Sequence, residues 1–211
     1  MNEKNLILKV LKLDRDIYDN LLQSNNSFQL LLPLFFIYQF ISYFVTKILS
    51  INYLRNFKTY ISTNSEYLGF TSDEINTLSS DIDSFIEIIN APFQINDIIS
   101  SIFLGLIMLS IYLGGIFLAL KLKQIQANFK DLVILYLASL IPKIFYLSVL
   151  FVNDPVSQGL IVFVFFIYSL VVRSSALKQT YFLNNFNSFI FIIWPFVAIF
   201  ISSFILNLLI L

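Results

Sequence analysis

The sequence predicts an all-α membrane protein, a bundle of five transmembrane helices with an N-terminal and an outer-loop amphipathic helix. Apolar residues make up 58% of the 211 residues and charged residues only 12%, with a mean hydropathy of +0.82, a balance typical of chains that lipid surrounds. The apolar runs lack strict alternation, which favours helices over barrel strands. Five runs are long enough to cross a hydrocarbon core of about 30 Å, at 28–46, 98–120, 132–152, 156–172 and 188–211.

The segment before the first span, 1–27, predicts one amphipathic helix on the cytoplasmic side. Its apolar residues recur at steps of three and four: Leu6, Val10, Leu13, Ile17 and Leu21. We expect no cleavable signal peptide, because charged residues interrupt the apolar ones and no small-residue cleavage site follows. The helix is expected to anchor the chain on the inner leaflet or to pack under the bundle. The alternative is a docking surface for a cytoplasmic partner.

Basic residues divide unequally between the two sides of the predicted bundle, with nine on the N-terminal side and three on the other. The positive-inside rule therefore places the N-terminus in the cytoplasm and the C-terminus at the outer face. The nine are Lys4, Lys9, Lys12, Arg15, Lys121, Lys123, Lys130, Arg173 and Lys178, and the three are Lys47, Arg55 and Lys58. The transmembrane domain, 28–211, then carries an acidic outer loop at 47–97.

The outer loop predicts a second amphipathic helix, lying on the membrane surface. Thr71 and Glu74 have the spacing of a capping box, and Pro92 ends the run. The apolar stripe consists of Ile75, Leu78, Ile82, Phe85 and Ile89. Asp81 and Asp83 are read as solvated acids in preference to a cation site, since a calcium loop needs more oxygen ligands and a glycine.

Small residues in the second span predict a packing face. Ser110 and Gly114 are four residues apart and Gly115 extends the pair, so another helix can approach closely there. Packing within the chain is favoured over a homodimer contact, because this motif is common in membrane helices.

Lys143, directly after Pro142, is a charge near the middle of the third span. A lysine there costs about 3 kcal/mol, and no Asp or Glu lies within the five runs to pair with it. We expect Pro142 to kink the helix, and Lys143 to reach toward headgroups or an inner cavity. Two readings stay open: a snorkelling lysine beside a kink, which is favoured, or a contact for a substrate, a lipid phosphate or an acidic partner.

Composition excludes several activities. The chain has no His and no Cys, so Ser-His and Cys-His catalysis, zinc or haem ligation through those residues, and disulfides are excluded. It lacks the glycine-lysine loop that binds nucleotide phosphates, and its basic residues follow topology without suggesting nucleic acid. We expect no catalytic residue, no metal and no cofactor. A membrane enzyme is a third and less favoured alternative.

The order of parts resembles the Yip family of Rab-interacting membrane proteins. A cytoplasmic stretch leads through 14–32 (DRDIYDNLLQSNNSFQLLL) into the first of five spans. The best local match is 132–147 (LVILYLASLIPKIFYL), in which Ser139 and Pro142 resemble the Ser/Pro element of the family's third span. The long insertion before the second span differs from the compact eukaryotic members. For eukaryotic members the resemblance implies vesicle trafficking with Rab GTPases; no individual binding residue carries over.

The sequence therefore predicts a non-enzymatic, Yip-like membrane subunit or scaffold. Its partners are expected to be the lipid bilayer and either a membrane protein or a second copy, and no nucleic acid. The alternative is a transport component in which Lys143, Pro142 and Ser139 line a path for a small or anionic solute. Richness in Phe, Ile and Asn suggests an AT-rich genome and a bacterial inner membrane.

Overall fold

The computed structural model describes residues 3–24, 26–92 and 94–210, and the side chains of these residues except 3–6, 15, 66 and 199–210. All regular structure in this part is helical, which confirms the predicted all-α class. Four helical segments there are long and apolar enough to cross a membrane: α3 (Ser27–Thr63), α6 (Ile95–Leu122), α7 with η1 (Phe129–Phe151) and α8 (Pro155–Tyr181).

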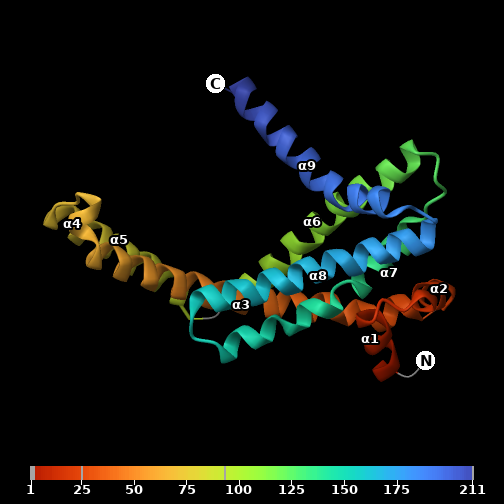
Figure 1. Cartoon of the computed structure of the whole chain (residues 1–211), viewed down its shortest axis with the longest axis horizontal. Helices are drawn as coiled ribbons and strands as arrows, with labels where there is room; N and C mark the ends of the chain where they lie inside the picture. The colour runs from red at the N-terminus through yellow and green to blue at the C-terminus, as the bar shows by residue number, and fades with distance from the viewer. Residues whose placement is uncertain (1–2, 25, 93, 211) are drawn as a thin grey trace.

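The fifth predicted span, 188–211, falls on α9 (Asn185–Ile210), whose backbone is helical over 26 residues. The described side chains of α9 end at Ala198, so much of this prediction lies outside the described side chains. Figure 1 shows α9 beside α6 at its start and then diverging from the other helices.

The helix that carries the first predicted span continues far beyond residue 46, where that span was predicted to end. Helix α3 has 37 residues and is about 55 Å long, because residues 47–63 contain no Gly or Pro that would stop it. Helix α4 (Ser65–Leu68) and helix α5 (Ser72–Asn90) turn the chain back, and Figure 1 shows them beside the end of α3. We name this projection, residues 47–91, the helical arm.

Helix α5 begins with the predicted capping box, in which the Thr71 side chain bonds the Glu74 backbone and the Glu74 carboxylate bonds Thr71. Its expected place on the membrane surface stays a prediction, while the structure shows α5 in contact with α3. Ile82 is buried, and Lys58 of α3 forms an ion pair with Asp83 at 2.6 Å. The predicted loop is therefore a helical hairpin.

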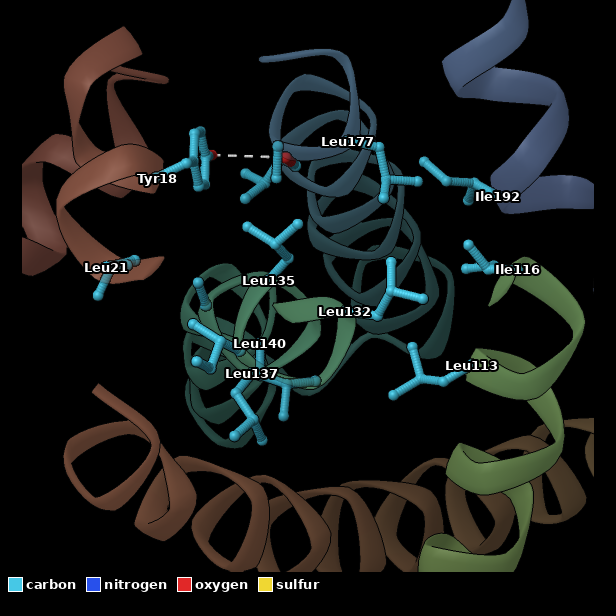
Figure 2. Close-up of a cluster of buried hydrophobic side chains, with 14 of the residues drawn as sticks. Tyr18, Leu21, Leu113, Ile116, Leu132, Leu135, Leu137, Leu140, Leu177 and Ile192 are labelled. Carbon is cyan, nitrogen blue, oxygen red and sulfur yellow. Dashed lines mark hydrogen bonds between the residues drawn. The ribbon is translucent and has the colours of Figure 1, made fainter. Parts of the chain in front are cut away.

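The N-terminal segment forms two helices, α1 (Glu3–Leu11) and α2 (Arg15–Gln23), and the prediction of one helix is wrong. Leu13 takes the left-handed conformation (φ 57°), and the Asp14 carboxylate then caps α2 by accepting from the Asp16 backbone N–H. Figure 2 shows Tyr18 of α2 pointing toward α8, where its hydroxyl donates to the Val172 carbonyl at 3.4 Å. Burial of Tyr18 raises the pKa of its phenol. The segment is part of the bundle.

The core is centred on α7 (Phe129–Ala138). Its leucines, with Leu140 just beyond, lie between α2 on one side and α6 and α8 on the other (Figure 2). Leu132, Leu135 and Leu137 are each at most 2% exposed. This segment is the most enclosed of the four candidate spans, so other helices pack around it.

The third span changes helix type at Pro142, where a kink was predicted. Helix α7 ends at Ala138, and the 3-10 helix η1 (Ile141–Phe151) follows with Pro142 in its first turn. A 3-10 helix has three residues per turn, so every third side chain lies on one face. Lys143, Tyr146 and Val149 share such a face, and all three are buried. The change of helix type thus turns Lys143 into the bundle.

Candidate functional site

The Lys143 ammonium lies inside the protein. The residue is only 7% exposed, and its Nζ donates to the Tyr38 Oη at 3.3 Å. Nζ also lies 4.7 Å from the centroid of the Tyr38 ring and 5.6 Å from that of Phe166. Lys143 was expected to reach either the lipid headgroups or an inner cavity, and in the structure it lines a cavity.

Arg173 is a second buried cation, and sequence reasoning missed it. It was counted among the cytoplasmic residues after the fourth span, but α8 continues to Tyr181 and Arg173 is only 5% exposed within it. The continuation has a visible signal, since residues 174–177 are uncharged and contain no Gly or Pro. Removing Arg173 leaves eight basic residues against three, so the predicted orientation is unchanged.

Aromatic rings and a serine hold the Arg173 guanidinium. Its Nε donates to the Ser139 Oγ at 3.2 Å, and its Cζ lies 4.5 Å from the Tyr136 ring centroid and 4.9 Å from that of Tyr112. The Tyr112 hydroxyl itself donates to the Ile192 carbonyl of α9 at 3.2 Å. The Ser139 carbonyl accepts from the Ser169 hydroxyl at 2.9 Å, which ties α8 to the end of α7. Ser139, a predicted site residue, therefore positions Arg173.

Both cations line one cavity of about 370 Å³ between α3, α6, α7, η1, α8 and α9. Polar groups cover one part of its wall and apolar side chains the rest. The lining residues are Tyr38, Gln39, Gly105, Met108, Leu109, Tyr112, Tyr136, Lys143, Phe166, Arg173 and Phe196. No carboxylate is among them, and the described side chains include no ion pair to either cation. We name this space the cationic cavity.

Gly105 lets Gln39 reach the cationic cavity from α3. A Cβ at Gly105 would lie 2.2 Å from the Gln39 Nε2, so any larger residue would displace that amide. The amide adds hydrogen-bonding capacity beside the two cations. This contact could not be predicted from the sequence, because a single glycine in an apolar run does not indicate which side chain packs against it.

The remaining predicted site residues lie elsewhere. Pro142 is buried at the start of η1 but does not line the cavity. Ser110 bonds the Leu106 carbonyl of its own helix at 2.8 Å. A Cβ at Gly114 would meet no atom within 4 Å, whereas one at Gly115 would lie 3.1 Å from Pro195 of α9. Gly115 thus packs within the chain, and Ser110 and Gly114 do not share that contact.

The part of the chain that the structure describes contains no group of three or more His, Cys, Asp or Glu side chains arranged to hold a metal ion. Comparisons with protein-family models, with curated proteins and with solved structures find no match for this chain. The Yip resemblance therefore stays a prediction.

Proposed function

We propose that this chain is a membrane protein that binds a small anion in the cationic cavity, as a component of anion transport. The observation that carries the proposal is that Lys143 and Arg173 line one cavity between the candidate spans, and that the cavity wall includes no carboxylate. A charge within a membrane span is a functional candidate by default, and two like charges in one cavity call for a counterion.

The described partners within the chain stabilise the two cations but do not neutralise their charge, because none of them is an anion. Aromatic faces contribute about 2 kcal/mol to a desolvated cation, and a hydrogen bond to a charged group contributes about 1.5–3 kcal/mol. These terms leave both positive charges in a low-dielectric site. An anion with carboxylate or phosphate oxygens would neutralise them, and the planar Arg173 suits such oxygens.

The proposal includes five spans, with α9 as the fifth, a cytoplasmic N-terminus and a bacterial inner membrane. The 26-residue length of α9 and the excess of Lys and Arg near the N-terminal side support this topology. In this topology, the helical arm lies outside the membrane on its outer side, and the cationic cavity lies within the membrane.

The test is anion-dependent thermal stability of the purified chain in detergent. Sodium phosphate and sodium glutamate should raise the Tm of the wild type above sodium chloride at equal ionic strength, because a ligand at one hundred times its Kd adds about 2.7 kcal/mol. Lys143→Met and Arg173→Gln should lose this increase. Lys121→Met, at an exposed lysine of α6, is the matched control and should keep it.

Two results contradict the proposal: no anion raises the Tm of the wild type, or the increase persists in Lys143→Met. The second result would assign the binding to another part of the chain, since Met keeps an unbranched side chain one atom shorter than that of Lys and removes the ammonium group.

The second candidate function is the non-enzymatic, Yip-like subunit or scaffold. The observation that favours it is the open space at Gly114, where no other described part of the chain packs. A helix from another protein could approach closely there. Purification of the tagged chain from its native membrane in mild detergent tests this candidate. A membrane protein that co-purifies at fixed stoichiometry with the wild type, and is lost in Gly114→Leu, supports it; a lone chain contradicts it.

A further inference from the structure

We propose that the groove between α8 and α9 binds an anionic phospholipid, with its phosphate at Lys178 and Ser175 and an acyl chain between the two helices. Two adjoining cavities make up the site, one of about 650 Å³ and one of about 450 Å³, and they share Ser175 and Lys178. None of the lining residues belongs to the cationic cavity, so the inference does not rest on the proposed function.

The larger cavity suits an acyl chain. Ile167 and Val171 of α8 line it opposite Phe189 and Ile193 of α9, and its exposed surface is almost entirely apolar. Its volume is in the range of ligand pockets, about 300–1,000 Å³. Because Val171 and Phe189 are 43% and 50% exposed, this groove opens on the outside of the bundle, where lipid lies.

The polar end of the groove suits a phosphate. Gln179 Nε2 donates to the Ser175 Oγ at 3.0 Å, so the Ser175 hydroxyl keeps its own hydrogen for an anionic oxygen. Lys178 is exposed at both cavities and forms no ion pair among the described side chains. Asn185, also on the wall, begins α9, whose N-terminal dipole favours negative charge.

The position of the polar end beside the apolar groove favours a phospholipid over a free phosphate. A cation and a hydroxyl lie in the last two turns of α8, at the membrane boundary of a span, and the apolar groove runs from them along the same helix. Basic pockets between transmembrane helices bind anionic headgroups in this way. A free phosphate would use the polar end alone and leave the apolar groove without a role.

Native mass spectrometry of the chain in detergent tests the inference, with phosphatidylglycerol and phosphatidylcholine of identical acyl chains as probes. The wild type should bind phosphatidylglycerol more tightly. Lys178→Gln should weaken that binding about fivefold, the effect of one basic residue near a headgroup, and leave phosphatidylcholine unchanged. Val171→Trp should fill the groove and weaken the binding of both lipids.

Lys121→Gln is the matched control, because Lys121 is an exposed lysine in the last turn of α6 and lies outside the groove. It should bind as the wild type does, and so should Lys143→Met, which separates this site from the cationic cavity. Equal binding of the two lipids by the wild type overturns the inference. So does an unchanged preference in Lys178→Gln, or binding of inorganic phosphate without retention of phosphatidylglycerol.

Discussion

Tyr38→Phe removes one oxygen atom, and with it the hydrogen-bond acceptor of a buried charge. The Lys143 Nζ donates to the Tyr38 Oη at 3.3 Å, and the described side chains offer it no ion pair. A hydrogen bond to a charged group contributes about 1.5–3 kcal/mol. Because the ring remains, the cation–π contact at 4.7 Å is kept. We expect Tyr38→Phe to lower the free energy of unfolding by about 2 kcal/mol.

Lys143→Met should cost less, although it deletes a whole charge. An ammonium within a span costs about 3 kcal/mol, and its hydrogen bond and cation–π contact together offset about the same amount. Removing both the charge and its contacts should therefore change stability by less than about 1 kcal/mol. Removing only the acceptor leaves the cost of the buried charge in place, which is why the smaller change is the more damaging one.

The double variant isolates this contact. In the Lys143→Met background, Tyr38→Phe should cost less than about 0.5 kcal/mol, so the coupling energy is about 2 kcal/mol. Reversible unfolding in mixed micelles, followed by far-ultraviolet circular dichroism, measures all four proteins; Trp194, the single tryptophan, reports separately on α9. Additive effects of the two substitutions would refute the assignment of Tyr38 as the partner of Lys143.

Three further predictions use the same unfolding assay or hydrogen exchange. Ser139→Ala removes the acceptor of the Arg173 Nε and should cost about 2 kcal/mol, whereas Ser148→Ala, whose hydroxyl bonds the Phe145 carbonyl of its own helix, should cost less than about 0.5 kcal/mol; equal costs contradict the role of Ser139. Gly114→Ala should be neutral or stabilising, and Gly115→Ala should be about 1 kcal/mol less stable than Gly114→Ala, because its Cβ would press on Pro195; the reverse order would argue against the α6–α9 contact. Bonds from Thr71 lower the pKa of Glu74 below its ordinary value of 4.5, so the carboxylate stabilises the start of α5 at neutral pH and this contribution is lost as the pH falls through the lowered pKa. The protection factors of the amides in the first turn of α5, which correct for the intrinsic pH dependence of exchange, should therefore fall in acid for the wild type and depend less on pH in Glu74→Gln. The same pH profile of protection in both proteins contradicts this prediction.

The sequence predicts the helical class and the capping box of α5, since both depend on local composition and spacing. The prediction of the first span does not reveal that its helix continues to Thr63, because residues 47–63 are too polar to extend the apolar run and contain no Gly or Pro that would stop a helix. The spacing of apolar residues in 1–27 also predicts one helix where there are two, because the left-handed conformation of Leu13 does not interrupt that spacing.

The sequence reveals one of the two cations of the candidate site and not the other. Lys143 stands out in the sequence, since a lone charge in an apolar run is visible without a structure. Arg173 does not, because it lies at the edge of its apolar run and a topology count assigns it to the cytoplasmic side. Its partners Tyr112, Tyr136 and Ser139 come from other helices, so only the three-dimensional packing brings the two cations to one cavity.

Calorimetric titration of the chain in lipid nanodiscs with phosphate and with glutamate, at constant ionic strength, tests the cationic cavity most directly. The account predicts that one of these anions binds, with one ion per chain, and that binding is at least about thirtyfold weaker in Lys143→Met, since truncating one partner of a buried charge pair costs 2 kcal/mol or more. Absence of binding, or equal affinity in wild type and variant, would contradict it.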